Sequence, residues 1–242
     1  MRKISKNYSP NFSIPKRSKN KIKFIILHYT GMKKESVALK RLCDEKSKVS
    51  AHYFIKKNGH LINLVPDMYE AWHAGNSCWK KTRSLNKYSL GIEIQNQGHN
   101  HNYEKFSSKQ ILVLKKLLKQ LVKIYNVGPE NILGHSDIAP ERKKDPGEKF
   151  PWKILAKSNL AKWHKLSEKK IQKYRLIKLN SEEENFFLKN LNFIGYKKIK
   201  TLNSNLGKKF LYKAFQRRFR QSLINGIPDK ECLLISKNLV KS

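Results

Sequence analysis

The stretch FIILHYT, residues 24–30, carries the pattern on which the predicted fold depends. Its first four residues form a short, continuous apolar run, which is typical of a strand buried on both faces of a sheet. Apolar segments at 52–55 and 61–65 flank Asn58-Gly59. This dipeptide favours a tight β-hairpin turn because both of its positions tolerate positive φ. A further strand is predicted at 90–94, LGIEI.

Helical patterns alternate with these strands. Between 107 and 125, apolar residues recur at helical spacing, with Ser107 or Ser108 as the N-cap. Ile132-Leu133 predicts another strand, and apolar spacing from Trp152 to Trp163 predicts a closing helix. Because strands and helices interleave, residues 21–165 are expected to form an α/β domain with a mixed central sheet flanked by helices.

The two ends of the chain differ from residues 21–165 in composition and in hydrophobic pattern. Residues 1–20 are basic and contain two prolines, so we expect a flexible arm. Residues 166–180 are polar and basic and are predicted to be a linker. Residues 181–242 carry three amphipathic patterns, which predict a small all-α module. Its first helix is expected to begin at a capping box with Ser181 as the N-cap and to end at Gly195.

The net charge is the strongest feature of the composition. The 242 residues include 52 Lys and Arg against 18 Asp and Glu, a formal charge of +34. An anionic partner is therefore the first to consider, although compositional bias on exposed positions would give the same surface. Lysine far outnumbers arginine, which fits a general positive field better than base reading. Since no nucleic-acid-binding motif is present, a nucleic-acid-binding protein is the least favoured reading.

The sequence shows no recognisable targeting signal and no cysteine motif. No apolar run is long enough for a transmembrane helix, and the basic N-terminus lacks the apolar segment of a secretory signal. We therefore expect a cytoplasmic protein without a transmembrane segment. The three cysteines are far apart and are expected to be free thiols.

Three candidate metal ligands follow from the predicted strands. His28 stands at the end of the first strand, His135 comes just after Ile132-Leu133-Gly134, and Asp145 lies ten residues further in a loop. The ends of neighbouring strands converge in α/β sheets, where sites form. Two imidazoles and one carboxylate are a known ligand set for catalytic zinc, with the fourth position left for water.

Five segments together resemble a known family. They are FIILHYT (24–30), SAHYFIKKNGHLINLV (50–65), AWHAG (71–75), LGIEIQNQG (90–98) and ILGHSDIAPERKKDPGEKFPW (132–152). In this order they are similar to the zinc-dependent N-acetylmuramoyl-L-alanine amidases, the broad group that also holds the peptidoglycan recognition proteins. The resemblance implies that His28, His135 and Asp145 bind one Zn²⁺. It also implies hydrolysis of the amide between N-acetylmuramic acid and L-alanine.

Further site residues follow partly from strand geometry and partly from this resemblance. Glu93 alternates with Ile92 and Ile94, so its side chain is expected to project into a cleft. The resemblance implies that Glu93 is the general base, which takes a proton from the attacking water and passes one to the leaving amine. It also implies that Lys143 stabilises the oxyanion, although Arg142 and Lys144 are alternatives at this position.

The predicted substrate contacts are Trp72, His73 and His52. Trp72 is expected to stack on a sugar, and His73 either to orient the substrate or to pack in the interior. His52 is expected to contact the substrate or to support a metal ligand.

The C-terminal segment carries a second resemblance. FLKNLNFIGY (187–196), AFQRRFR (214–220) and INGIPD (224–229) look like a three-helix peptidoglycan-binding domain. A generic helical cap on the amidase is the alternative. A wall-binding module favours the cell envelope over the cytoplasm, so both compartments stay open.

Taken together, the sequence predicts a monomeric zinc hydrolase that acts on peptidoglycan or on muropeptides, including anhydro-muropeptides. A peptidoglycan-recognition protein without catalysis is the alternative. The apparently complete set of His28, His135, Asp145 and Glu93 favours the enzyme.

Overall fold

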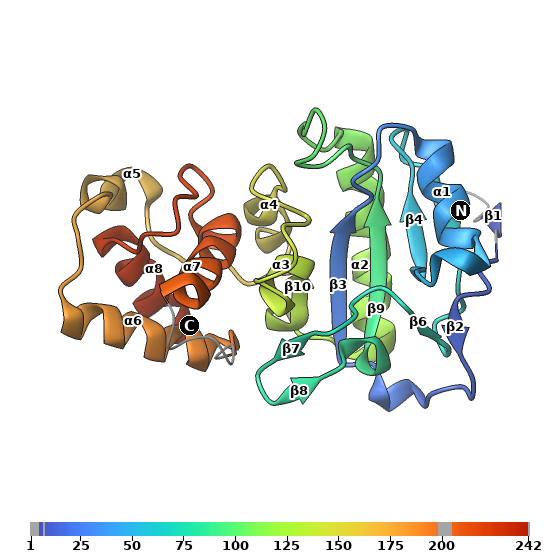
Figure 1. Ribbon diagram of the computed structural model, residues 1–242, viewed down its shortest axis with the longest axis horizontal. Coiled ribbons are helices and arrows are strands. Elements are labelled where there is room, and N and C mark those ends of the chain that lie inside the picture. Colours follow the sequence, from blue (N-terminus) through green and yellow to red (C-terminus); the bar gives the residue numbers. More distant parts are fainter. Residues whose placement is uncertain (1–4, 7, 198–204, 242) are drawn as a thin grey trace.

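The computed structural model describes residues 5–6, 8–197 and 205–241. Strands and helices up to α4 form one part of the molecule, and α5 to α8 gather at the opposite end from β1 and β2 (Figure 1). The expectations for residues 1–4, 7, 198–204 and 242 lie outside the described residues.

The central sheet is mixed, as predicted. Within the described ranges it has six strands in the order β1-β5-β4-β9-β3-β10. Their bounds are β1 Ser5–Lys6, β3 Phe24–Tyr29, β4 Tyr53–Ile55, β5 Leu61–Asn63, β9 Ser89–Ile94 and β10 Ile132–Gly134. The strands β4, β9, β3 and β10 run parallel, whereas β4 and β5 form the antiparallel hairpin expected around Asn58-Gly59. Two small antiparallel pairs, β2 Phe12–Ser13 with β6 Glu70–Ala71 and β7 Cys78–Trp79 with β8 Thr82–Arg83, lie outside it.

The two faces of the sheet pack against different parts of the chain. On β3, Ile25 and Leu27 belong to the core cluster that includes the apolar side of α2, Ser108–Tyr125. Because strand side chains alternate, Phe24, Ile26 and His28 point to the opposite face. Helix α2 begins after Ser107, whose hydroxyl accepts a hydrogen bond from the Gln110 backbone amide, which decides between the two predicted caps. A separate cluster joins α1, Glu35–Cys43, to the β4–β5 hairpin.

Two short helices follow the last strand. Helix α3, His135–Ile138, begins directly at the end of β10, and α4 covers Trp152–Ala156. The closing helix is therefore shorter than its apolar spacing predicted, since Leu160 and Trp163 lie beyond its end. Both residues still pack into the core, which explains why they are apolar.

The expectation of a flexible arm at residues 1–20 is wrong for most of its described part. Strand β2 pairs with β6, and both Ser9 and Asn11 are buried. The buried Arg17 guanidinium donates hydrogen bonds to the Asp67 and Asn86 carbonyl oxygens. Because these partners are distant in sequence, no local sequence pattern predicts the contacts.

The helical module consists of α5 Glu168–Ile171, α6 Ser181–Ile194, α7 Asn205–Phe219 and α8 Lys230–Lys241. Helix α6 is capped by Asn180, one residue before the expected cap, in a reciprocal box with Glu183. It ends at Gly195, as predicted. The expected linker, residues 166–180, is instead folded as part of this module: Ile171 of α5 is buried, and Arg175 forms a two-pronged ion pair with Glu231 of α8.

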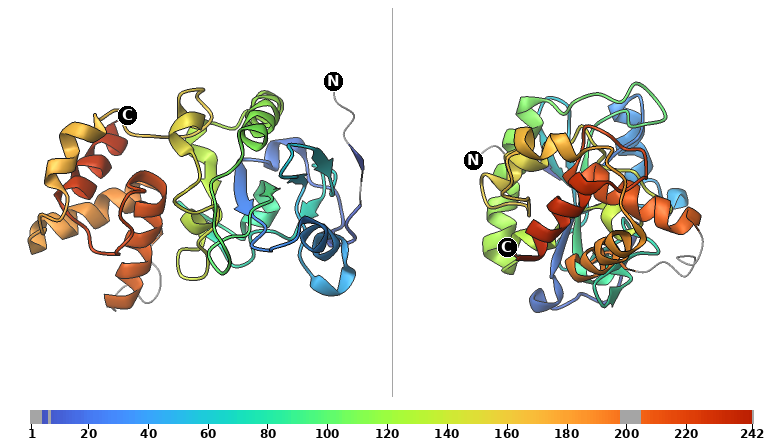
Figure 2. Two further views of the ribbon diagram at one scale, coloured as in Figure 1. Left: turned by 90° about the horizontal axis from the view of Figure 1, so that it is seen from above. Right: turned by 90° about the vertical axis from the view of Figure 1, so that its left-hand side faces the viewer.

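One hydrophobic cluster runs through both parts of the molecule. It joins Phe24 and Ile26 of β3 and Leu133 of β10 to side chains of α6, α7 and α8, among them Phe187, Leu191, Phe215 and Leu239. The module lies beside the α/β part in the left view of Figure 2. The helices therefore bury apolar surface against the sheet domain as well as against each other.

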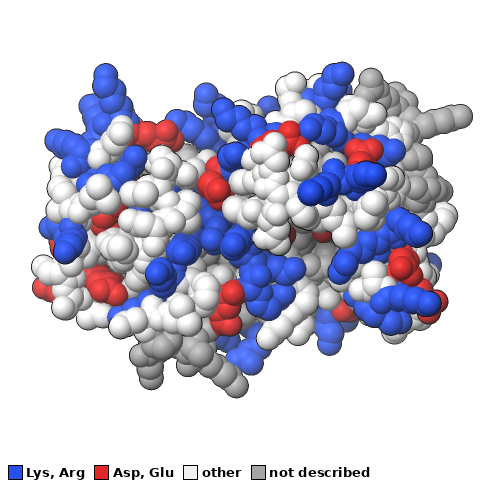
Figure 3. Space-filling model, turned by 45° about the horizontal axis from the view of Figure 1, so that its top comes forward, with Lys and Arg blue, Asp and Glu red and all other residues white. Residues whose placement is uncertain are grey.

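The positive charge is spread over the surface. Figure 3 shows Lys and Arg side chains across the whole visible face, with isolated acidic side chains between them. Such a distribution gives a broad positive field. Among the described residues, no helix has the combination of length and hydrophobicity that crossing a membrane requires.

We expect Arg17→Met to lower the free energy of unfolding by about 2–4 kcal/mol, because it strands buried carbonyl groups of two loops. Urea denaturation measures this loss. Lys19→Met, at an exposed position of the same segment, is the control and should change stability by less than about 0.5 kcal/mol. Equal stability of both variants would show that the N-terminal segment is not part of the cooperative fold.

Candidate active site

An open cleft of about 510 Å³ lies at the carboxyl end of β3 and β9, on the face of the sheet away from α2. His28 and Glu93 are direct neighbours in the parallel register of these two strands, so their side chains share this face. Helix α1 contributes Arg41 and Leu42 to the cleft, and the loop after α3 contributes residues 142–145.

The three predicted metal ligands meet at the floor of the cleft. The Nδ1 atoms of His28 and His135 are 3.0 Å apart. The Oδ2 atom of Asp145 lies 2.9 Å from the first nitrogen and 3.1 Å from the second. All three side chains are buried. Residues 117 positions apart in sequence thus place one ligand atom each at the corners of a small triangle.

A chain of hydrogen bonds fixes the tautomer of His28. The Ser89 hydroxyl donates to the Leu85 carbonyl oxygen at 2.6 Å, so its oxygen accepts from His73 Nε2 at 3.2 Å. His73 Nδ1 then accepts from His28 Nε2 at 3.1 Å. This leaves His28 Nδ1 with a free lone pair directed at the triangle. Burial lowers the pKa of His28 to about 4, so that the ring is neutral near pH 7.

His135 is held in the same way. Its Nε2 donates to the Ala74 carbonyl oxygen at 3.1 Å, which leaves Nδ1 free. The Ser136 backbone amide donates to the Asp145 carbonyl oxygen, so the two ligand segments are tied together. Gly134 permits this approach, because a Cβ atom there would lie 2.7 Å from Pro146 Cδ.

This donor set fits a zinc ion. Two unprotonated nitrogens and a carboxylate oxygen at such short distances repel one another unless a cation lies between them. A tetrahedral ion with bonds of about 2.0–2.1 Å needs ligand atoms roughly 3.3 Å apart, which is close to the observed spacing.

Glu93 lines the cleft beside the triangle. Its Oε2 atom is buried and has no hydrogen-bond partner among the described residues. Burial and, next, the nearby negative charge of Asp145 raise the pKa of Glu93 well above its usual value, and Lys143 opposes them. An unpartnered carboxyl group with a raised pKa, next to a metal triangle, is suited to proton transfer.

In the structure, Lys143 differs from its two cationic neighbours in its contacts and its burial. Arg142 also lines the cleft, but its Nη2 atom is engaged as a donor to the carbonyl oxygens of Ala74 and Asn76. Lys144 is exposed, whereas Lys143 is half-buried, lies on the cleft and acts electrostatically on both Glu93 and His28. Among the described residues its ammonium group forms no ion pair, so it can face a developing negative charge.

The three predicted substrate contacts lie at different depths. Trp72 is half-buried on the cleft wall and is held by a hydrogen bond from Nε1 to Ser13. His73 is mostly buried and bonds His28, and it also lines the cleft, so both expectations for it stay open. The structure corrects the expectation of substrate contact for His52: the ring is fully buried and bonds the Gly91 amide through Nδ1 and the Tyr69 carbonyl through Nε2.

Sequence reasoning missed some residues of the site, and it considered Arg142 only for another role. Ser89 completes the tautomer chain, and Arg142 fixes the carbonyl group that orients His135. Arg41 and Asn100 also line the cleft. Ser89 and Arg142 act on partners from other segments of the chain, so no local spacing marks these roles; the cationic run 142–144 was the one available signal.

Comparisons with known proteins agree with this geometry. Residues 18–148 match the family model for N-acetylmuramoyl-L-alanine amidase. The N-acetylmuramoyl-L-alanine amidase AmiD of Escherichia coli is 33% identical over 91% of this chain and 83% of its own length.

Two solved structures are also similar over nearly the whole chain. One is AmiD of E. coli in complex with the substrate anhydro-N-acetylmuramic acid-L-Ala-D-γ-Glu-L-Lys, with a TM-score of 0.81, 32% identity and coverage of 95% of this chain and 92% of that one. The other is AmpDh3 of Pseudomonas aeruginosa in complex with anhydromuramic pentapeptide, with a TM-score of 0.79, 29% identity and coverage of 100% and 98%. By fold, site and sequence, the chain belongs to the N-acetylmuramoyl-L-alanine amidase family, whose members in general depend on zinc.

Proposed function

We propose that this amidase uses zinc in the cleft to hydrolyse the amide bond between N-acetylmuramic acid and L-alanine. The observation that carries the proposal is the buried triangle of His28, His135 and Asp145, with the unpartnered Glu93 carboxyl group beside it. A bound Zn²⁺ would supply Lewis-acid chemistry, in which the attacking water is acidified and the amide carbonyl is polarised.

The protein's own residues supply the proton transfers and the charge stabilisation. Glu93 accepts a proton from water while the oxygen of that water attacks the amide carbonyl carbon. The amide C–N bond then breaks, and Glu93 passes the proton to the leaving nitrogen of L-alanine. Lys143 places a positive charge near the developing oxyanion. The products are the carboxylate of the muramic acid and a free peptide amine.

The substrate class follows from the cleft and from the relatives. Arg41, Lys143 and Lys144 line the cleft, and they suit the carboxylates of a stem peptide. Both similar complexes hold an anhydro-sugar joined to a peptide. We therefore propose soluble anhydro-muropeptides as substrates, with intact peptidoglycan as the second candidate. Binding of the polymer by the helical module stays a prediction.

Removal of metal should abolish hydrolysis. We expect a chelator to stop the release of L-alanine-terminated peptide from an anhydro-muropeptide and added Zn²⁺ to restore it, because the triangle offers the metal its ligands. Chromatographic analysis of the products measures both steps. Full turnover by a protein shown to be free of metal would contradict the zinc site.

Glu93→Gln should lower kcat by about 10²–10⁴-fold, since an amide cannot accept the proton of the attacking water. Zinc content, measured by elemental analysis, should stay at the wild-type level. The matched control is Glu104→Gln, which removes a carboxylate paired with Lys57 on the surface. Undiminished turnover by the Glu93 variant would exclude it as the base.

Lys143→Met should lower kcat by about 10²–10³-fold and change KM much less, because a fixed charge near the oxyanion acts mainly in the transition state. Lys144→Met, at the exposed neighbouring position, is the control for loss of general positive charge. If both variants raise KM alike and leave kcat intact, the lysines only attract substrate.

A further inference from the structure

Asp137 is a buried carboxylate two residues after the metal ligand His135. Its Oδ2 atom accepts a hydrogen bond of 2.7 Å from the Gly134 backbone amide. This bond holds the turn at which β10 ends and α3 begins, and His135 is the first residue of α3. The backbone of the ligand is therefore fixed through the carboxylate of Asp137.

The charge partner of Asp137 comes from the helical module. Arg218, near the end of α7, places Nη1 3.3 Å from Asp137 Oδ2. At most 2% of either side chain is exposed to solvent. The Nη2 atom of Arg218 donates to the Ile132 carbonyl oxygen on the edge strand β10 at 3.1 Å. The guanidinium group also lies over the Trp152 ring, with 3.4 Å between its carbon and the ring centroid.

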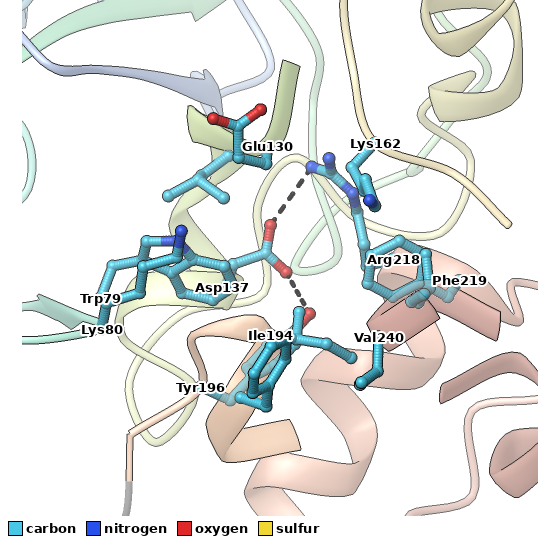
Figure 4. Close-up of a pocket in the computed structure, with 13 residues that line it drawn as sticks. Trp79, Lys80, Glu130, Asp137, Lys162, Ile194, Tyr196, Arg218, Phe219 and Val240 are labelled. Carbon is cyan, nitrogen blue, oxygen red and sulfur yellow. Dashed lines mark hydrogen bonds and ion pairs between the residues drawn. The ribbon is translucent and has the colours of Figure 1, made fainter. Parts of the chain in front are cut away.

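A second group from the module completes the cluster. The Tyr196 hydroxyl, just after α6, donates to Asp137 Oδ1 at 2.7 Å. Figure 4 shows Arg218 and Tyr196 reaching Asp137 from opposite sides, next to a cavity of about 200 Å³. Tyr196 is itself packed against Trp79, and Gly195 accepts a hydrogen bond from the Lys80 amide of the β7–β8 hairpin.

We propose that Arg218 and Tyr196 are positioning residues of the metal centre: the helical module holds His135 in place through Asp137. The inference rests on the proposed function, because it assigns His135 to the metal. All three links run through buried, hydrogen-bonded groups, and a buried carboxylate is stable only while its cation is present. Without Arg218, Asp137 loses its charge partner, and the support that its carboxylate gives to the turn carrying His135 is weakened.

This proposal gives the module a role apart from binding a polymer. A partner that orients a metal ligand typically changes metal affinity about 10–100-fold when it is removed. The module would then be needed for hydrolysis of small soluble substrates as well as of peptidoglycan. It also explains why polar groups, rather than apolar ones alone, join the two parts of the molecule.

The test compares the zinc affinities of full-length variants by competition with a chromophoric chelator. We expect Arg218→Met to weaken zinc binding about tenfold or more. Tyr196→Phe, which removes one hydrogen bond, should weaken it about two- to tenfold. The visible absorption bands of the Co²⁺-substituted protein should shift in both variants, since they report the geometry of the ligands. Circular dichroism verifies that each variant is folded.

Arg175→Met is the matched control, because it breaks an ion pair with Glu231 inside the helical module and away from α3. We expect it to lower thermal stability and to leave zinc affinity unchanged. A double-mutant cycle with Asp137→Asn should show that the effect of Arg218→Met is largely lost when the carboxylate is absent.

Wild-type zinc affinity in folded Arg218→Met and Tyr196→Phe would overturn the proposal. So would equal weakening of zinc binding by Arg175→Met, which would indicate general destabilisation. If Arg218→Met does not fold, Tyr196→Phe and Arg218→Lys decide the question in the same assay. Failure of the wild-type protein to hydrolyse muropeptides, with zinc affinity still dependent on Arg218, would contradict the proposed function and leave this inference standing.

Discussion

The parallel register between β3 and β9 is the constraint on which the site depends. It places His28 beside Glu93 at the end of two buried strands, on the face that α2 leaves uncovered. His135 follows the next strand, β10, which pairs with β3 on its other side. Two of the proposed metal ligands and the proposed base therefore take their positions from one sheet. A slip of one residue on β3 would turn the side chain of His28 toward the core under α2.

Polar groups at this floor are buried, so each needs a partner, and the partners form directed chains. His28 leads through His73 to Ser89, and His135 leads to Ala74, which Arg142 also holds. These chains leave one lone pair on each ligand nitrogen. Asp137 links the turn before His135 to the helical module through Arg218 and Tyr196. The site is thus supported by the sheet, by the segment around Ala74 and by the helical module, which contacts Asp137.

Much of the fold was predictable because its signals are local. The apolar run at 24–27, the turn at Asn58-Gly59 and the cap at Ser107 each act within a few residues. The metal triangle was predictable from strand ends and from family motifs. The ordered N-terminal segment was not, because Arg17 finds its acceptors about 50 and 69 residues away. The folded segment 166–180 was missed for the same reason, since Arg175 depends on Glu231.

The sequence by itself determined the alternation of strands and helices and membership of a family, and it predicted three metal ligands and a base. These depend on residue type, order and period, all of which a linear pattern preserves. Only the tertiary structure decided that His73 supports His28, that His52 lies away from the cleft, and that Arg142 rather than Lys143 is held by backbone carbonyl oxygens. It alone placed Arg218 against Asp137. Such contacts join segments whose separation in sequence carries no information about their distance in space, because packing of the whole core brings them together.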